Sequence, residues 1–341
     1  MIAPRIHPRR IVALRRALLD WYRAHKLDYP WRRSSDSYRV WVAEVMLQQT
    51  RIAVVIPAYA RFLHAFPSLG ALAGADLESV LSAWSGLGYY TRARALHAAA
   101  RVLVGRGASE FPRDYDEARR LPGVGPYTAA AVLSIAYGHT HAAVDGNIVR
   151  VLSRLQGLGA ADARGEPYAG VAAQLLDQQH PGDWNQALME LGQNLCLPKT
   201  PLCGSCPLRR LCTAYRLGEV HRFPPRRRRL LRERVDVDLT ILRDRAQSLL
   251  LERGAFPYLP HLWLPPTRRL AGATAVATLK HSILHRDFHV RVFAQTVSSR
   301  QLQQMARAET AVERRLCTPA QLLSIGRSSL LTKALAIAPP P

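Results

Sequence analysis

The stretch "LPGVGPYTAAAVLSIAYG", residues 121–138, carries a G-x-G pair flanked by prolines between two segments of helical periodicity. Gly123 and Gly125 permit a tight turn that a neighbouring group can approach closely. Pro126 suits the first turn of the alanine-rich helix that follows, and the N–H groups at that helix start are free to face a phosphate. A lone G-x-G usually only links two helices. With a helix on each side, the motif predicts a hairpin that fixes register on a nucleic acid backbone without reading bases.

The composition is that of an ordered and strongly basic chain. Its 341 residues suffice for two packed cores, and 48% hydrophobic with 21% charged residues is typical of a globular protein. Lys and Arg number 47 against 25 Asp and Glu, a net charge of +22. Such a field attracts polyanions, although a basic solvated surface is the plainer explanation. No apolar run is long enough to cross a bilayer, and no signal peptide is read at the start.

Apolar residues recur with helical spacing from about residue 9 to residue 220, where no strand pattern is found. In the first of these helices, Ile11, Leu14, Leu18 and Trp21 share one face. Turns rich in Gly and Pro separate the segments. Further helices are expected near residues 40–64, 76–85, 90–105, 115–120, 127–137, 146–157, 168–179 and 184–194.

The composition changes at "HRFPPRRRRLLRER", residues 221–234, where two prolines and seven arginines predict a basic linker. It could be a solvated tether or an arm along a phosphate backbone. Beyond it, "VDVDLTILRD", "QSLLLERG" and "FHVRVFAQTV" alternate with period two, as strands do. The fold class expected is therefore mainly α. It comprises a helical domain over 1–220, a linker over 221–234 and a smaller α+β domain over 235–341.

Four cysteines lie within seventeen residues, as Cys196-x6-Cys203-x2-Cys206-x5-Cys212. This clustering indicates a metal site in a reducing compartment rather than a disulfide framework. Zinc suits four thiolates, but zinc sites usually pair two short C-x2-4-C elements and only one is present. The spacing favours an iron–sulfur cube, with zinc as the alternative. Cations beside the ligands, at Lys199, Arg209 and Arg210, could meet phosphate.

Two carboxylates stand out from their surroundings. In "VWVAEVMLQQT", residues 40–50, Glu44 lies among apolar residues, where an unpaired charge is costly. It either pairs with a cation or keeps its proton with a raised pKa, which is the profile of a general acid. Asp145 directly precedes a helical run, and an N-cap is the common role for aspartate there. An ionised Asp near a protonated Glu would resemble the two-carboxylate chemistry of glycoside cleavage.

Four motifs now stand in a fixed order: "EVMLQQT", "LPGVGPYTAAAV", "VDGNIVRVL" and the cysteine pattern. In this order they resemble the endonuclease III superfamily of DNA glycosylases. "PWR" at 30–32, "GLGYYTRARALH" and the extra C-terminal domain are similar to its adenine-removing branch. The resemblance implies a helix–hairpin–helix glycosylase of base excision repair, with a [4Fe-4S] cluster and a Nudix-like recognition domain. Its substrate would be adenine mispaired with 8-oxoguanine or guanine, flipped out of the duplex and released by hydrolysis.

The same resemblance implies roles for individual residues. Glu44 would protonate adenine at N7, and Asp145 would stabilise the oxocarbenium ion, either electrostatically or as a transient covalent partner. Tyr127 and Asn147 would support this step. The other implied assignments are Arg32 at the adenine edge, Gln48, Gln49 and Tyr89 around the mispair, Gly123 and Gly125 at the DNA backbone, and Cys196, Cys203, Cys206 and Cys212 as cluster ligands.

Tyr127 predicts the reaction type. Relatives that also cut the strand carry a lysine at this position, whose amine forms a Schiff base with the sugar, and tyrosine cannot do so. A monofunctional glycosylase that uses water is therefore expected. One alternative is a glycosylase/lyase for oxidised pyrimidines, which Tyr127 and the second domain argue against. Others are an iron–sulfur DNA-binding protein without activity, which Glu44 and Asp145 argue against, and a thymine-mismatch glycosylase, which would lack the second domain.

The C-terminal domain departs from the branch it resembles. Many members contact the oxidised base with a Phe-Ser-His triplet, whereas "LKHSILHRDF" places Ile283, Leu284 and His285 there. Ser282 could replace the missing hydroxyl, recognition could depend on His285 and shape, or Ile283 and Leu284 could simply pack in the core. No R-E-x-x-E-E signature occurs, so recognition rather than nucleotide hydrolysis is expected. The expected partner is duplex DNA with an A:8-oxoG or A:G mispair, with no membrane, for a monomer in a bacterial cytoplasm near the nucleoid.

Overall fold

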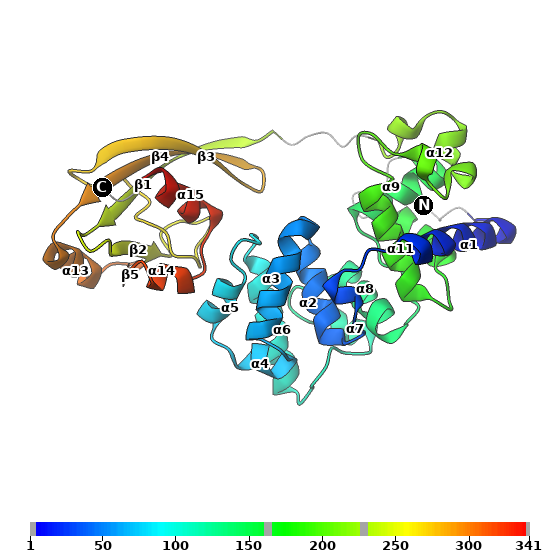
Figure 1. Ribbon diagram of the computed structural model, residues 1–341, viewed down its shortest axis with the longest axis horizontal. Coiled ribbons are helices and arrows are strands. Elements are labelled where there is room, and N and C mark those ends of the chain that lie inside the picture. The colour runs from blue at the N-terminus through cyan, green and yellow to red at the C-terminus, as the bar shows by residue number, and fades with distance from the viewer. Residues whose placement is uncertain (1–4, 160–165, 226–230, 339–341) are drawn as a thin grey trace. The chain divides into compact units, whose positions relative to one another are not determined.

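The computed structural model describes residues 5–159, 166–225 and 231–338 (Figure 1). The chain divides into two compact units, one formed by residues 1–73 with 98–228 and the other by residues 74–97 with 229–341. The predicted linker, 221–234, lies partly outside the described residues, since 226–230 are not among them. At its ends, helix η4 covers Val220–Arg222 and strand β1 begins at Glu233.

The described residues up to 225 are helical and contain no strand, as the sequence predicted. The predicted helix over 40–64 is wrong, because it is two helices, α2 and α3. Gln49 between them has φ +55°, a left-handed conformation that a right-handed helix cannot pass through. The elements are α1 (Pro8–His25), η1 (Pro30–Arg32), α2 (Ser37–Leu47), α3 (Ile52–Ala65), α4 (Leu69–Gly74), α5 (Leu77–Ala83), α6 (Thr91–Gly105), α7 (Tyr115–Arg119), α8 (Pro126–Tyr137), α9 (Gly146–Gln156), α10 (Glu166–Leu175), α11 (Pro181–Asn194), η2 (Cys203–Ser205), η3 (Arg209–Leu211), α12 (Thr213–Arg216) and η4.

Aspartates start several of these helices. The side chains of Asp36, Asp76, Asp114 and Asp145 each accept a hydrogen bond from the backbone N–H three residues further on. Each satisfies one of the amide groups that a helix start leaves without a partner, at about 1 kcal/mol per cap. These caps fix where α2, α5, α7 and α9 begin.

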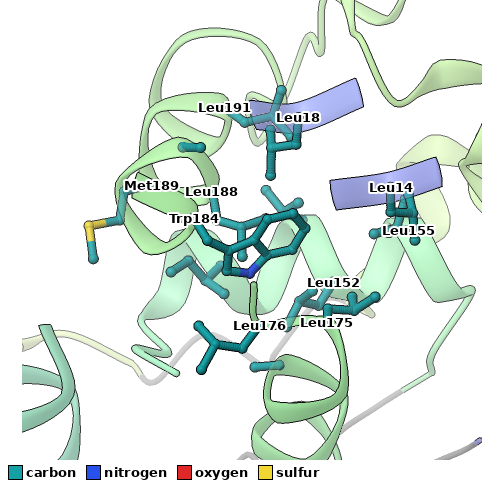
Figure 2. Close-up of a cluster of buried hydrophobic side chains, with 14 of the residues drawn as sticks. Leu14, Leu18, Leu152, Leu155, Leu175, Leu176, Trp184, Leu188, Met189 and Leu191 are labelled. Carbon is teal, nitrogen blue, oxygen red and sulfur yellow. The ribbon is translucent and has the colours of Figure 1, made fainter. Parts of the chain in front are cut away.

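A buried cluster around Trp184 joins α1, α9, α10 and α11 (Figure 2). Leu14 and Leu18, from the predicted face of the first helix, are fully buried in it. Each such side chain contributes about 1.5–3 kcal/mol when it leaves water. Its members include Leu14, Leu18, Leu152, Leu155, Leu175, Leu176, Trp184, Leu188 and Leu191. The cluster therefore holds α9 and α11, which carry several candidate site residues, in one rigid arrangement.

The C-terminal part is a mixed sheet with helices, which confirms the predicted α+β class. Within the described residues five strands pair in the order β3-β4-β1-β2-β5, with β1 and β4 parallel and the other pairs antiparallel. The elements are β1 (Glu233–Arg243), β2 (Leu249–Arg253), β3 (Thr274–Ile283), β4 (Arg286–Thr296), α13 (Ser299–Arg307), β5 (Glu313–Cys317), α14 (Gln321–Ser324) and α15 (Ser329–Ile337).

Alternate residues of β1 join different cores. Leu239 and Ile241 pack with Leu331 of α15, whereas Leu242 packs with Leu302 of α13. The sheet is therefore covered on both faces at this end. Residues 74–97 pack with this unit, where Arg315 pairs with the carboxylate of Glu78 and other contacts join Arg327 to Ser85 and Tyr90. No helix in the described residues is both long and apolar enough to span a membrane.

Candidate active site

Glu44 is buried in this structure, as its apolar surroundings predicted. Its side chain projects from α2, a helix buried over most of its surface, and the residue is only 5% exposed. Tyr127 donates a hydrogen bond from its hydroxyl to Glu44 Oε2 at 2.8 Å. Burial raises the pKa of Glu44 to about 7. The Tyr127 hydrogen bond and the charge of Arg32 oppose this rise in pKa, and the charge of Asp145 adds to it. Glu44 therefore keeps a proton to near neutral pH.

Tyr127 stands in the first turn of α8, directly after the hairpin. Besides Glu44, its hydroxyl contacts the sulfur of Met189 at 3.5 Å. Burial raises the pKa of Tyr127 well above its ordinary value, and the charges of Glu44 and Asp145 act in the same direction. The phenol consequently stays protonated and serves as a hydrogen-bond donor.

Asp145 is the N-cap of α9, as its position before a helical run predicted. Its Oδ1 accepts a hydrogen bond from Ile148 N at 2.8 Å, and its Oδ2 accepts one from Asn147 Nδ2 at 3.0 Å. Both bonds fix the orientation of the carboxyl group. Because the charge of Asp145 acts on Glu44 and on Tyr127, the residue also belongs to the same site.

A pocket of about 460 Å³, measured out to open solvent, lies beside Glu44. Arg32 lines it and is held by an ion pair from its Nη1 to Glu190 Oε2 at 2.7 Å. The guanidinium also lies 5.4 Å from the ring of Tyr22 and 4.9 Å from that of Tyr29. The lining residues are Tyr29, Trp31, Arg32, Val40, Ala43, Glu44, Leu47, Ile52, Ile135, Gln186, Met189 and Gln193.

Glu190 was not predicted from the sequence. It is 2% exposed and lies in the apolar stretch "ALMELG" of α11. That is the pattern that singled out Glu44, so the same reasoning about a carboxylate in an apolar helix would have found Glu190. The sequence pattern does not show which cation pairs with Glu190. The structure shows that it is Arg32.

The residues assigned to the mispair differ in how they are held. Gln48 ends α2, and its Nε2 donates to Thr128 Oγ1 at 3.1 Å. Gln49 and Tyr89 are both exposed and have left-handed backbones, with φ +55° and +46°. Such conformations cost about 1–3 kcal/mol in residues other than glycine and gather at binding sites. Tyr89 lies 5.4 Å from the guanidinium of Arg92, which also lies 5.5 Å from the ring of Trp84.

The hairpin forms between α7 and α8 as predicted, but its two glycines act differently. Gly123 has φ +74°, a conformation that strongly favours glycine. Gly125 has φ −85° and is the N-cap of α8, so its backbone does not require glycine. A Cβ at Gly125 would meet no atom within 4 Å. The space in front of the helix start is therefore open to a ligand.

The four cysteines line one cavity of about 410 Å³. Among residues 5–159, 166–225 and 231–338, no three cysteine, histidine or acidic side chains are placed to hold a single metal ion. A zinc ion would need four sulfurs at about 2.3 Å from one point. Four thiols that line one cavity are the ligand types that both zinc and an iron–sulfur cluster use. Burial raises the pKa of Cys206 to about 12 and also raises the pKa of Cys203 and Cys212.

Arg150 links this cysteine loop to Asn147. Its Nη2 donates to Asn147 Oδ1 at 3.1 Å and to Gly192 O at 2.7 Å, and its Nε donates to Cys196 O at 2.7 Å. Gly192 approaches closely, since a Cβ there would lie 3.0 Å from Asn147 Cβ. Asn147 is thus fixed from three sides: by Asp145, by Arg150 and by α11.

In the C-terminal unit, Leu284 and His285 form the turn between β3 and β4, and both are exposed. Leu284 is 66% exposed with φ +54°, so core packing is the wrong explanation for it. Ile283 does pack against the core. The Ser282 hydroxyl donates to Asp287 Oδ1 at 2.7 Å, so it is already engaged within the hairpin.

Comparison with known proteins matches this architecture. Residues 42–168 match the family model of the HhH-GPD superfamily of base excision DNA repair proteins. The chain is 45% identical to human (Homo sapiens) adenine DNA glycosylase over 216 residues, 60% of this chain and 40% of the human protein. Over 200 residues it is 37% identical to adenine DNA glycosylase of Buchnera aphidicola subsp. Baizongia pistaciae (strain Bp), 58% of this chain and 57% of that protein. These similarities confirm the resemblance to adenine DNA glycosylases that the sequence motifs indicated.

A solved structure of a thermostable thymine-DNA glycosylase is 27% identical, with a TM-score of 0.57, and the match covers 61% of this chain and 98% of that one. This chain spans 40% to 57% of the length of the two adenine DNA glycosylases. Because those relatives come from an animal and a bacterium, the predicted bacterial cytoplasmic location stays a prediction.

Proposed function

We propose that this protein is a monofunctional DNA glycosylase that hydrolyses the N-glycosidic bond of adenine mispaired with 8-oxoguanine or guanine. The observation that carries the proposal is the geometry of Glu44: a buried carboxyl with a pKa near 7, hydrogen-bonded to Tyr127, beside an open pocket. The matched segment 42–168 and the similarity to adenine DNA glycosylases support it.

Glu44 and Asp145 have different roles in the proposed reaction. Glu44, protonated, donates its proton to N7 of the base, which turns the base into a better leaving group. Asp145, ionised and held by Ile148 N and Asn147, stabilises the positive charge that develops on the sugar as the bond breaks. Water then attacks the sugar. Tyr127 supports Glu44 by orienting its carboxyl through the 2.8 Å hydrogen bond.

Arg32 and Glu190 form the part of the pocket that would read the edge of the base. The Nε–H of Arg32 is buried and has no hydrogen-bond partner among the described residues. A buried donor without a partner is costly, and an acceptor on a bound base would satisfy it. Glu190 keeps the guanidinium in place through the 2.7 Å ion pair.

The position of Tyr127 supports hydrolysis without strand cleavage. A strand-cutting relative would need a lysine amine here to form a Schiff base. The side chain is instead a phenol whose hydroxyl already donates to Glu44, and no lysine is among the residues that line the pocket.

The cysteines fit a [4Fe-4S] cluster, with Cys196, Cys203, Cys206 and Cys212 as the thiolate ligands. When bound, the cluster would order the loop 196–212, which presents Arg209 and Arg210 for contact with the DNA backbone. The left-handed Gln49 and Tyr89 and the open space at Gly125 support contacts to the mispaired duplex.

The unit with the mixed sheet acts, in this proposal, as a Nudix-like module that recognises the base opposite adenine. The sheet between α13 and α15 supports this assignment, and His285 at the exposed β3–β4 turn is the candidate contact. We place the catalytic domain at 1–220, the linker at 221–234 and this module at 235–341, and we expect the protein to act as a monomer on duplex DNA.

A panel of duplexes tests the function. Adenine opposite 8-oxoguanine, adenine opposite guanine, thymine opposite guanine, and thymine glycol are each incubated with the full chain, with and without alkali. We expect cleavage of the adenine strand only, and only after alkali. Cleavage at thymine would favour a thymine-mismatch glycosylase, the class of the 27% identical structure. Cleavage without alkali, or a covalent adduct trapped by borohydride, would favour a lyase.

A further inference from the structure

Arg154 of α9 is a buried cation without an acidic partner. The residue is 3% exposed, and within the described residues its hydrogen bonds go to carbonyl oxygens and one cysteine sulfur, with none to a carboxylate. A guanidinium stays charged in proteins. Burying such a charge without a counter-charge is costly. The carbonyl oxygens offset part of this cost, and an anion near Arg154 would offset the rest.

The cysteine cavity is the place where that anion would be. Arg154 lines the cavity together with the four cysteines, and its Nη1 lies 3.3 Å from Cys196 Sγ. The rest of the lining is mostly apolar, with Val151, Leu155, Leu191 and Leu208 among its members. Four thiolates around a [4Fe-4S] core leave the whole assembly negative, so the guanidinium and the loaded site neutralise each other.

Arg154 also joins two backbone segments, one just after the first cysteine of the pattern and one beyond the last. Its Nη1 and Nη2 donate to the segment after the first cysteine, and its Nε donates to the segment after the last one. The acceptors are Leu197 O at 2.7 Å, Pro198 O at 3.1 Å, Val220 O at 3.1 Å and Phe223 O at 2.9 Å. One planar side chain thus joins the entry and the exit of the loop.

We infer that Arg154 is a positioning residue of the cysteine site, which supplies the counter-charge for the bound thiolates and closes the loop around them. This inference rests on the cluster proposed above. It predicts that the arginine affects both how firmly iron is retained and how readily the cluster takes up an electron, because net charge and hydrogen bonds to sulfur set the potential of such clusters.

Arg10 provides a matched control. Its Nη2 donates to Leu155 O at 2.9 Å, to Leu211 O at 3.0 Å and to Thr213 Oγ1 at 3.1 Å. It therefore clamps the same loop next to the last cysteine, yet it makes no hydrogen bond to a sulfur in the described structure. Arg10→Gln removes this clamp, and with it a charge that acts on Cys212, but leaves in place the guanidinium of Arg154 that donates to a cysteine sulfur.

The experiment compares wild type, Arg154→Gln, Arg154→Lys and Arg10→Gln as full chains. Iron per chain, the rate of iron loss to a chelator, and the midpoint potential from protein-film voltammetry are measured. Losing an outer-shell partner usually weakens metal affinity about 10- to 100-fold, so we expect Arg154→Gln to lose iron faster by a factor of that order. Its potential should fall, because a cation no longer favours the reduced cluster. Arg154→Lys should keep the wild-type potential but lose iron faster. Arg10→Gln should lower the potential less than Arg154→Gln does, because Arg10 acts on Cys212 without a hydrogen bond to a sulfur.

Unchanged iron loss and potential in Arg154→Gln, with iron present in the wild type, would overturn the inference alone. Iron-free wild type that still releases adenine would instead overturn the proposed cluster. Circular dichroism shows whether Arg154→Gln folds. If it does not, Arg154→Lys is the deciding variant, because lysine keeps the charge but not the planar guanidinium. Iron loss from Arg154→Lys at the wild-type rate would then contradict the role of the guanidinium in closing the loop. A potential in Arg10→Gln as low as that of Arg154→Gln would contradict the particular role of Arg154.

Discussion

Replacing Glu44 by glutamine should make the protein more stable at alkaline pH. The native pKa of about 7 lies above the ordinary value of 4.5, so the folded chain binds this proton more tightly than the unfolded chain does. Below pH 4.5 both states are protonated and Glu44 adds no penalty. As the pH rises from 4.5 to 7 the unfolded chain ionises first, and stability falls until the folded chain ionises as well.

The penalty follows from these two pKa values. Since each pKa unit is worth about 1.4 kcal/mol, a native value of about 7 against 4.5 corresponds to about 3 kcal/mol above neutral pH. Glutamine has nearly the same shape, stays neutral, and its amide oxygen can still accept from Tyr127. We therefore expect Glu44→Gln to exceed wild type by up to about 3 kcal/mol at pH 8, and by much less at pH 5.

Urea denaturation of both proteins at pH 5, 6, 7 and 8 measures this difference. Asp20→Asn is the control, because that carboxylate is 63% exposed and pairs with the exposed Arg16. It should follow the wild-type pH dependence. A stability difference between Glu44→Gln and wild type that stays constant from pH 5 to pH 8 would refute the reasoning, since it would mean that Glu44 ionises alike in both states.

Three further predictions concern activity and the cysteine loop. Tyr127→Phe removes the hydrogen bond that lowers the Glu44 pKa, so the fall in base release above about pH 7 should move to higher pH; a single-turnover pH profile that keeps its midpoint would contradict this. Gly192→Ala brings a Cβ to 3.0 Å from Asn147 Cβ. If Asn147 and Asp145 shift by about 1 Å as a result, base release should slow by about 100-fold. Gly105→Ala is the control, because a Cβ at Gly105 would meet no atom within 4 Å, and it should release the base at the wild-type rate. Removing iron by chelation should raise hydrogen exchange in residues 196–212. The core of α1, α9 and α11 around Trp184 should stay protected from exchange. An equal loss of protection in the loop and in this core would show that the loop does not unfold as a separate unit.

The features that the sequence predicted best are those set by neighbours in the chain. The turn at Gly123 and the cap at Asp145 depend on a few adjacent residues, and the structure has both. The burial of Glu44 followed from the apolar residues around it. What local pattern could not provide was the partner of each group: Arg32 for Glu190, Asn147 for Asp145, and Arg150 for both Asn147 and the cysteine loop.

Other features were missed because their residues lack a periodic pattern. The left-handed Gln49 divides what reads as one apolar helix, and no glycine marks the break. Strand β3 is an edge strand whose alternation is blurred by a bulge between Ala275 and Ala277, so its sequence does not resemble a half-buried strand. Residues 74–97 read as part of the helical domain by their helical pattern, yet they group with residues 229–341 in one compact unit, which only tertiary structure can reveal.

The central claim is that Glu44 and Asp145 break the glycosidic bond of a flipped adenine. It is tested most directly by measuring adenine release and DNA binding together, on a duplex with adenine opposite 8-oxoguanine, for wild type, Glu44→Gln and Asp145→Asn. The account predicts that both variants bind the duplex about as tightly as wild type and release no measurable adenine under single-turnover conditions. Adenine release at the wild-type rate from either variant would contradict it.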